Sequence, residues 1–324
     1  MWPESIQLQP IVRGRQPRKV GEVIIFEPVC RNRNTLLFLC LLKCFDMSRR
    51  FSFALAAVLT LFLAGSCNKS GTAEHRRTST SQAYPKAKRV TRIVQYNVGV
   101  FSKEVENSIP MVAAMMKEIG ADAMSLNELD SCNTRHPNNQ LADFAVAMGG
   151  WNHNFSRAMS YREGAYGVGI AVPDAIIDCF TIPLPQGEGS EPRACSVVET
   201  RKYVLASTHL DYVDEPSMVV QARTINEALA EKYSESKKPV VLAGDMNSTQ
   251  SSKVLSELKQ RWNVLSCIKN TYSAINPHEC IDFILALQNG AKYKVVGSDV
   301  PVYFNGGEVG VASDHLPVFV DVKL

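Results

Sequence analysis

Two stretches of the chain, PVVLAGDMNS at residues 239–248 and ASDHLPVFVDV at residues 312–322, carry most of the information about the fold. Each joins a short polar segment to a run of apolar residues. A continuous apolar run of roughly four to eight residues is typical of a strand that is covered on both faces. We therefore expect a buried β-strand in each stretch, with a group of polar side chains at one end of it.

The same pattern recurs from residue 92 to the C-terminus. Two segments between the apolar runs, 112–119 and 218–229, have their apolar residues on one helical face, which predicts two helices whose methionines lie in the core. Alternation of strands and helices over residues 91–324 indicates one α/β domain whose sheets are covered by helices. The predicted strands are residues 92–96, 121–125, 167–172, 203–207, 239–243, 281–286 and 317–322.

Polar residues gather at the ends of these predicted strands, where a rigid scaffold can direct side chains into a shared cleft. Carboxylate and amide oxygens, without cysteine, suit a hard cation such as Mg²⁺ or Mn²⁺. Histidines near carboxylates suit proton transfer, or the stabilisation of charge on a phosphoryl group. The residues in question are Asn97, Glu128, His209, Asp211, Asp245, Asn247, Asp282, Asp314 and His315.

These segments resemble the signatures of the endonuclease/exonuclease/phosphatase superfamily, and they occur in that family's order from about Arg92 to the C-terminus. The resemblance implies a four-layer α/β sandwich, in which two mixed β-sheets pack face to face with helices outside. It also implies hydrolysis of a phosphoester with a divalent metal. The segments are QYNVG at 95–99, LNELD at 126–130, YGVGIA at 166–171, STHLD at 207–211, GDMNS at 244–248 and SDHLPV at 313–318.

Carried over to the matching positions, the resemblance implies a metal site and a water-positioning pair. Glu128 corresponds to the main ligand of Mg²⁺ or Mn²⁺, with Asn97 and Asp314 completing the metal site directly or through water. Asp245 corresponds to the residue that orients or deprotonates the attacking water, and Asn247 to the residue that holds the phosphate.

The resemblance gives the two histidines separate roles. His315 is implied to contact the phosphoryl oxygens, with Asp282 as its carboxylate partner, and His209 is implied to be a general acid for the leaving oxygen. Asp211 either supports His209 or caps the segment that follows it. Tyr166 is a candidate substrate contact, although a tyrosine that opens a core strand can equally be structural.

Four further positions qualify the resemblance. Asn127 stands where the family has glutamine, and Val168 stands where it has an asparagine that contacts phosphate. Arg135 and Arg193 could each meet a phosphate, but a solvated surface arginine is the simpler interpretation of both.

The N-terminal part of the chain differs from the rest. Residues 47–67 combine a short basic segment, an apolar run and small residues before Cys67, which predicts a signal peptide with a lipobox-like end and lipidation of that cysteine. An ordinary signal peptide or a short buried helix is the alternative. Residues 1–46 would then be an upstream extension before Met47, and the polar residues 68–90 a flexible tether. We therefore expect an exported protein, anchored to a membrane by lipid or free in the periplasm or outside.

The net charge of +3 comes from 35 basic and 32 acidic residues, but nine of the basic and four of the acidic residues lie in residues 1–67. The remaining 26 basic and 28 acidic residues make the expected catalytic domain slightly acidic. This balance counts weakly against nucleic acid as the substrate, because a nuclease needs a basic groove.

Five cysteines follow Cys67, and export would allow disulfide bonds. The pairs Cys179–Cys195 and Cys267–Cys280 each bracket a predicted connection between strands, which would leave Cys132 free; five reduced thiols are the alternative.

The leading functional hypothesis is a monomeric, metal-dependent phosphodiesterase, with endonuclease activity as one form. The alternatives are a phosphodiesterase or phosphatase acting on lipid or inositol phosphates, or a binding protein that has lost catalysis on the same fold. Nucleic acid, phospholipid and phosphosugar all remain open as substrates, because the sequence shows neither a basic groove, nor a tryptophan-rich loop, nor a Lys/Arg cluster near the expected site.

Overall fold

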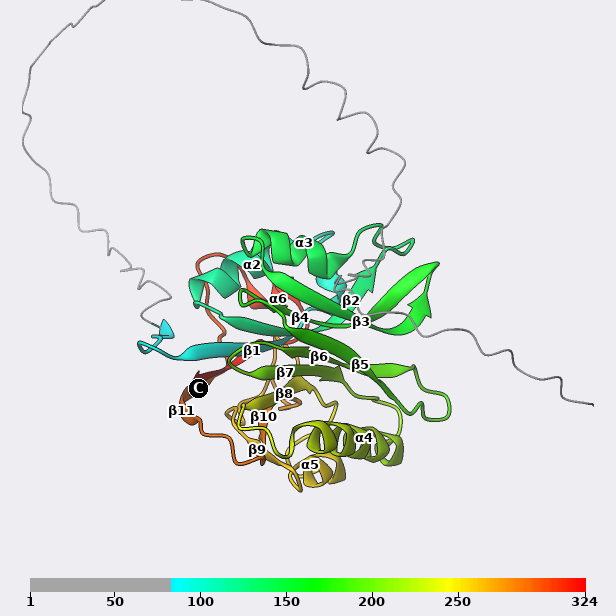
Figure 1. Ribbon diagram of the computed structural model, residues 1–324. Coiled ribbons are helices and arrows are strands. Elements are labelled where there is room, and N and C mark those ends of the chain that lie inside the picture. The colour runs from blue at the N-terminus through cyan, green and yellow to red at the C-terminus, as the bar shows by residue number, and fades with distance from the viewer. Residues whose placement is uncertain (1–82) are drawn as a thin grey trace, which may run out of the picture. The chain divides into compact units, whose positions relative to one another are not determined.

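The computed structural model describes residues 83–324, which form two six-stranded sheets with helices on their outer faces (Figure 1). Sheet A has the strand order β11-β12-β1-β2-β4-β3. Its strands are β1 (Thr91–Asn97), β2 (Ala123–Ser131), β3 (Asn152–Tyr161), β4 (Gly164–Val172), β11 (Lys294–Asp299) and β12 (Val318–Lys323).

Sheet B has the order β5-β6-β7-β8-β10-β9. Its strands are β5 (Asp178–Leu184), β6 (Arg193–Glu199), β7 (Val204–His209), β8 (Val240–Asp245), β9 (Trp262–Val264) and β10 (Asp282–Leu287). Both sheets are mixed. In sheet A β1 and β2 run parallel, in sheet B β7 and β8 do, and the other neighbouring strands pair antiparallel.

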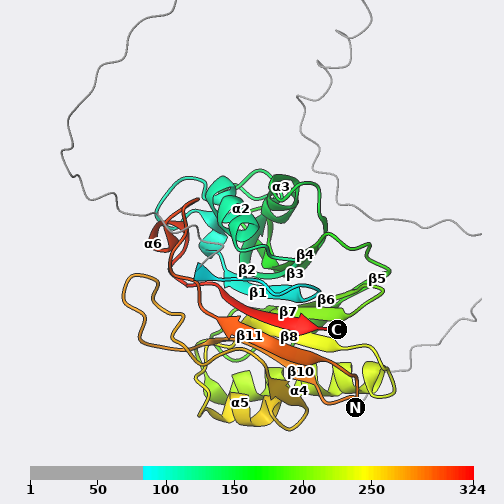
Figure 2. The same ribbon diagram turned by 90° about the vertical axis from the view of Figure 1, so that its left-hand side faces the viewer.

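Helices cover the outer face of each sheet, so the domain has four layers (Figures 1 and 2). Helices α2 (Ile109–Glu118) and α3 (Gln140–Ala147) pack on sheet A, and helices α4 (Glu215–Tyr233) and α5 (Lys253–Leu258) pack on sheet B. Two short segments, η1 (Gly99–Phe101) and α6 (Val309–Ala312), complete the helical part. The four-layer sandwich with two mixed sheets inside, expected from the sequence, is confirmed.

Three apolar cores correspond to the three spaces between the layers. Residues such as Ile93, Leu205 and Ile284 fill the space between the sheets, which explains why their strands are continuous apolar runs. Met115 and Met116 are buried between α2 and sheet A, as the helical stripe predicted. Burial of these side chains supplies most of the driving force that holds the layers together.

All seven strands predicted from apolar runs are present, and β3, β5, β6, β9 and β11 were missed. Three of the missed strands, β3, β5 and β11, lie at or near sheet edges and are exposed at several positions, so they lack a continuous apolar run. Strand β2 also differs from the prediction: it extends through Glu128 to Ser131 and contains a register shift between Leu126 and Leu129, typical of a β-bulge.

A buried ion pair fixes the amino end of β1. Arg92 is fully buried, and its Nε and Nη2 atoms each donate to the carboxylate of Asp321 on β12 at 2.7 Å. Nη1 donates to the carbonyl oxygens of Ile119 at 2.6 Å and Tyr84 at 3.0 Å. The guanidinium also lies over the ring of Phe319, 3.9 Å from its centroid. These contacts join β1, β12 and residue 84 into one packed unit.

The predicted disulfide pairs are wrong. Cys179, Cys195, Cys267 and Cys280 are free, whereas Cys132, which was expected to be free, is disulfide-bonded. In the β5–β6 ladder Cys179 is opposite Val198 and Cys195 is opposite Ile182, so the two cysteines are too far apart along the strands to bond.

Residues 1–82 lie outside the described residues, and with them the predicted upstream extension, the signal peptide, Cys67 and most of the predicted tether. Of the tether, residue Tyr84 packs against Phe304 and Phe319. Within residues 83–324, no helix has the length and apolar character needed to cross a membrane.

Candidate active site

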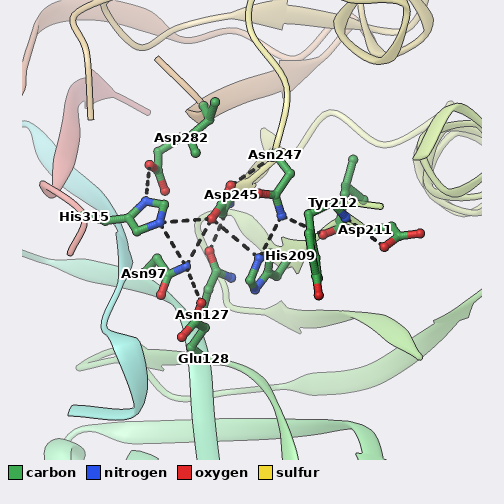
Figure 3. Close-up of polar contacts among 12 residues, drawn as sticks. Asn97, Asn127, Glu128, His209, Asp211, Tyr212, Asp245, Asn247, Asp282 and His315 are labelled. Carbon is green, nitrogen blue, oxygen red and sulfur yellow. Dashed lines mark hydrogen bonds and ion pairs between the residues drawn. The ribbon is translucent and has the colours of Figure 1, made fainter. Parts of the chain in front are cut away.

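A cavity of about 400 Å³ lies at the carboxyl ends of the two parallel strand pairs. In sheet B, four consecutive strands each bring one polar residue to this end: Arg193 opens β6, His209 ends β7, Asp245 ends β8 and Asp282 opens β10. Sheet A contributes Asn97, at the end of β1. Because the two sheets are packed face to face, residues from both reach one centre, which Figure 3 shows.

Apart from Asp211, whose role the sequence left open, the structure brings together every candidate site residue within the described part of the chain. Seven of them line the cavity, and the other two, Asn97 and Asp282, are hydrogen-bonded to these. The seven are Glu128, Tyr166, His209, Asp245, Asn247, Asp314 and His315.

His315 forms a buried pair with Asp282. The Nδ1 atom of His315 is 2.9 Å from Oδ2 of Asp282, so it carries a proton that it donates to the carboxylate. Burial alone would lower the pKa of His315, but the charge of Asp282, its hydrogen bond and the charges of Asp245 and Asp314 raise this pKa to about 10. The ring of Tyr272 packs against the imidazole with centroids 4.9 Å apart. His315 is therefore held in one orientation as a cation.

Asp245 lies at the centre of the site. Its Oδ2 atom is 3.5 Å from Nε2 of both His209 and His315, and it accepts a hydrogen bond from the Asn97 amide at 3.1 Å. Burial, and next the nearby charge of Asp282, raise the pKa of Asp245 to about 7. A carboxylate with a raised pKa is a stronger base than an exposed aspartate, and Asp245 is placed to accept a proton inside the cavity.

His209 and Asn247 form a second hydrogen-bonded pair. The Nδ2 atom of Asn247 donates to the carbonyl of Leu210 and to Nε2 of His209, both at 3.0 Å. His209 therefore carries its proton on Nδ1. Burial, followed by the charges of Arg193, His315 and Lys103, lowers the pKa of His209 well below its usual range, so the ring is neutral. A neutral imidazole in this place is a hydrogen-bond donor rather than a charged acid.

Asp211 does not support His209. Its Oδ1 atom accepts the backbone N–H groups of Tyr212 at 2.8 Å and Val213 at 3.2 Å, and in Figure 3 its carboxylate points away from His209. Of the two roles left open by the sequence, the structure supports the turn cap.

Glu128 and Asp314 form the acidic wall of the cavity. The amide of Asn97 donates to Oε1 of Glu128 at 3.1 Å. The ammonium group of Lys103 lies between the two acids, 3.0 Å from Asp314 Oδ2 and 3.9 Å from Glu128 Oε2. Two carboxylates and an amide that already attract a cation match the oxygen ligands that Mg²⁺ and Mn²⁺ prefer, so these residues fit the expected metal.

A second acidic group lies close by. Ligand atoms of Asp245, Asp282 and His315 all lie within 4.8 Å of one another, a grouping that could also hold a metal ion. However, His315 uses Nδ1 to donate to Asp282, and Asp282 also accepts from Gln95 at 3.2 Å. These hydrogen bonds favour Glu128 and Asp314 as the metal ligands.

Two site residues have backbone angles that non-glycine residues rarely adopt. The φ angle of Glu128 is +55° and that of Asn247 is +46°. Glu128 takes this conformation within the bulge of β2, which turns its side chain into the cavity although its neighbours follow the strand. Left-handed backbone at two cavity residues is consistent with a functional site, where such strain is often found.

A buried polar network beneath the cavity was missed by the sequence analysis. Asn127 donates to the carbonyl of Thr208 at 2.9 Å and accepts the backbone N–H of Asp245 at 3.0 Å, so it connects β2 to β7 and β8. Gln95 donates to both Asn127 and Asp282. The sequence offered no signal for this role beyond the position of Asn127 beside Glu128.

Lys103 and Arg193 are two further residues of the site that the sequence motifs did not identify. Lys103 follows η1 in a segment with no recognisable motif, and it reaches the acidic wall only because the chain folds back after β1. Arg193 was expected on the surface, yet it is only 4% exposed and lines the cavity together with Tyr166. Arg135, by contrast, is bound by Asp130 through Nε at 2.7 Å and Nη2 at 3.0 Å, outside this cavity.

The chain belongs to the Endonuclease/Exonuclease/phosphatase family, whose model matches residues 94–315. This confirms the resemblance found in the sequence. No curated protein matches the chain.

Solved structures are similar to it in fold. A family member from Bacteroides vulgatus is 18% identical, with a TM-score of 0.59 over 73% of this chain and 100% of its own. The mannosyl-6-phosphatase Bt3783 of Bacteroides thetaiotaomicron is 19% identical, with a TM-score of 0.58 over 72% and 99%. The human Nocturnin catalytic domain is 16% identical, with a TM-score of 0.55 over 72% and 93%.

Proposed function

We propose that this protein is a divalent-metal-dependent phosphoester hydrolase. The observation that carries the proposal is the position of Asp245, whose Oδ2 atom lies 3.5 Å from the Nε2 atoms of His209 and His315 on the wall of one cavity. A base between two imidazoles, beside a separate acidic wall, is an arrangement suited to attack by water on a phosphoryl group. The phosphatase activity stated for Bt3783, which has the same fold, agrees with the proposal.

Glu128 and Asp314 would hold the metal, Mg²⁺ or Mn²⁺, with Asn97 contributing its amide oxygen directly or through water. A bound divalent cation supplies Lewis-acid stabilisation of charge on a phosphoryl oxygen. Glu128 is held by the amide of Asn97, and the same amide also donates to Asp245. Asn97 therefore connects the acidic wall to the base, and it fixes their separation.

Asp245 would orient the attacking water and accept its proton. Its raised pKa, about 7, brings its basicity close to that required at neutral pH. The backbone N–H of Asn247 donates to Oδ1 of Asp245 at 2.9 Å, and the backbone N–H of Asp245 donates to Asn127. These bonds hold the carboxylate in one orientation and leave Oδ2 facing the histidines.

His315 would stabilise the negative charge that develops on the phosphoryl oxygens, because it is a cation fixed by Asp282. The Nδ1 hydrogen of His209 is buried and has no partner within residues 83–324, and a small rotation of the ring would let it donate to an oxygen of the substrate. A proton donation to the leaving oxygen, the role expected for His209 from the sequence, would be hindered by its lowered pKa. We therefore place His209 as a hydrogen-bond donor in the proposed mechanism.

Hydrolysis of p-nitrophenyl phosphate and of bis-p-nitrophenyl phosphate by the purified chain, with Mg²⁺ or Mn²⁺, tests the proposal. EDTA should abolish the activity, and Glu128→Ala and His315→Ala should each reduce it by at least about a hundredfold. Lys323→Ala, an exposed position on β12, serves as a control and should keep the wild-type rate. Equal rates in Glu128→Ala and the wild type would contradict the proposal, and a wild type inactive on all phosphoesters would favour a binding protein.

We further propose that residues 47–67 direct export and that Cys67 carries a lipid. The support is the order of basic, apolar and small residues in that stretch. Expression of the full chain in a bacterial host with labelled palmitate should label the protein, and Cys67→Ser should remove the label. Labelling that persists in Cys67→Ser would contradict lipidation at this cysteine.

A further inference from the structure

Two residues that line the cavity each have a buried side-chain nitrogen without a hydrogen-bond partner within residues 83–324: Nε of Arg193 and Nδ1 of His209. Leaving a buried donor unpaired costs about 1–3 kcal/mol, so such groups are rare in folded proteins. Both nitrogens belong to neighbouring strands, β6 and β7, at the carboxyl end of β7. Neither nitrogen is exposed to the cavity, but both residues line it, so a small rotation of each side chain brings an acceptor atom of a bound ligand within reach.

Within the described residues, the guanidinium of Arg193 has one ion-pair partner, the partly exposed Glu191. Its contacts are a 3.5 Å approach of Nη2 to Glu191, a hydrogen bond with the hydroxyl of Tyr166, and the ring of Tyr212, whose centroid is 6.0 Å from Cζ. A guanidinium has five N–H donors in a planar fork that fits two oxygens of one anion. The Glu191 side chain is 45% exposed, so this carboxylate can turn to solvent when another anion arrives.

Arg193 and His209 lie at one end of the row of site residues along sheet B, and Asp282 with its partner His315 lies at the other end. Along sheet B the order is Arg193 on β6, His209 on β7, Asp245 on β8 and Asp282 on β10. His315 is bonded to Asp282 and so lies at the far side from Arg193. A phosphoryl group held beside Asp245 would therefore have a cation on each side, His315 on one and Arg193 on the other.

We propose that Arg193, the Nδ1–H of His209 and the Tyr166 hydroxyl form an anion-binding wall that selects phosphate monoesters over diesters, a proposal that rests on the proposed hydrolase function. A monoester carries about 1.5 to 2 negative charges at neutral pH and three free oxygens. A diester carries one charge and two free oxygens, and its third oxygen is esterified. The third oxygen is free and charged only in the monoester, and it can accept hydrogen bonds from the guanidinium of Arg193. Recognition of a monoester therefore needs the donors on this wall, and recognition of a diester does not.

The experiment compares kcat/KM for p-nitrophenyl phosphate with that for bis-p-nitrophenyl phosphate. The wild type should prefer the monoester. In Arg193→Met, kcat/KM for the monoester should fall at least about tenfold more than for the diester, because only the monoester loses a charged contact. Arg193→Lys should recover part of the preference, since it keeps the charge without the fork. Arg223→Met, at an exposed ion pair on α4, is the matched control and should leave the ratio unchanged.

The binding of inorganic phosphate tests the anion-binding wall independently of turnover. Its dissociation constant, measured by calorimetry with Mn²⁺ present, should increase about tenfold in Arg193→Met and decrease in Glu191→Gln, which removes the competing carboxylate without emptying a buried position. A wild type that hydrolyses neither ester would refute the proposed function, and the phosphate titration would then decide on the wall alone. Active variants whose monoester-to-diester ratio equals that of the wild type, or unchanged phosphate binding in both variants, would refute the proposed selectivity.

Discussion

Strand β1 holds a buried polar residue at each end, and the two ends treat charge in opposite ways. At the amino end, Arg92 and Asp321 form a bidentate pair, and the remaining guanidinium nitrogen finds backbone carbonyls. At the carboxyl end, Asn97 lies between Glu128 and Asp245. Within residues 83–324, these two acids, with Asp282 and Asp314, share only Lys103 and His315 as ion-pair partners with a positive charge. Strand β1 thus has a balanced ion pair at its amino end and a site with more acids than cations at its carboxyl end.

The amino end of β1 contributes to stability, whereas its carboxyl end contributes to the candidate active site. A buried ion pair with all its donors used is stabilising only as a pair, because either partner alone would be an uncompensated buried charge. The carboxyl end keeps its acids close together at a cost in stability, which is the usual condition of sites that bind a cation or transfer a proton. Substitutions at the two ends should therefore change different quantities.

The largest effect is expected from Asp245→Asn. Removing the central base should lower kcat/KM by about a hundredfold to ten-thousandfold. The melting temperature should not fall, because the amide keeps the shape and removes the repulsion by Asp282 that raises the pKa of Asp245. Steady-state kinetics and calorimetry on the same preparation check both parts. A large loss of stability together with activity would mean that Asp245 is chiefly structural.

At the amino end of β1, where Asp321 pairs with Arg92, the substitution Asp321→Asn should lower stability and leave activity nearly unchanged. Breaking the pair leaves the Arg92 charge buried and should reduce the free energy of unfolding by about 3–5 kcal/mol, while kcat/KM of the folded enzyme stays within about threefold. Urea denaturation measures the first and initial rates the second. Lys269→Met, which breaks an ion pair whose lysine is 63% exposed, is the control and should cost less than about 1 kcal/mol. A small effect of Asp321→Asn would remove the contrast between the two ends.

A smaller effect is expected from Lys103→Met. The Lys103 ammonium lies where a metal held by Glu128 and Asp314 would have its charge, so metal binding must displace it. Its removal should tighten Mn²⁺ binding by about tenfold, an electrostatic effect of about 1.4 kcal/mol at this half-exposed position. Isothermal titration with Mn²⁺ alone measures it, and Lys103→Arg should bind as the wild type does. Weaker Mn²⁺ binding in Lys103→Met would show that the lysine supports the site instead of competing for it.

The smallest effect is expected from Asp211→Ala. The substitution removes the acceptor of two turn hydrogen bonds and should cost about 1 kcal/mol of stability. Activity should stay within about threefold of the wild type, because the carboxylate does not reach His209. Asp211→Asn keeps the acceptor and is the control for the turn. A hundredfold loss of kcat/KM in both variants would restore Asp211 as a partner of His209.

Apart from β6, whose sequence RACSVVE is interrupted by polar residues, the strands that carry the site could be predicted from sequence because both of their faces are covered. A strand buried between two layers needs an apolar residue at nearly every position, and such runs stand out in the chain, as in β8 and β10. The edge strands β3 and β11 have no such requirement and gave no signal. The pairing of Asp282 with His315 was likewise implied by the family motifs and is present at 2.9 Å.

The sequence by itself determined the family, the buried strands and the residues at their ends, because these properties depend on short runs of neighbouring residues. Only the tertiary structure decided what surrounds them. Arg193 enters the cavity wall because β6 pairs with β7, and Asn127 reaches Thr208 and Asp245 because the two sheets face each other. Such contacts join residues that are far apart in the chain. Whether a donor finds a partner therefore depends on the packing of the two sheets, which a short stretch of sequence does not reveal.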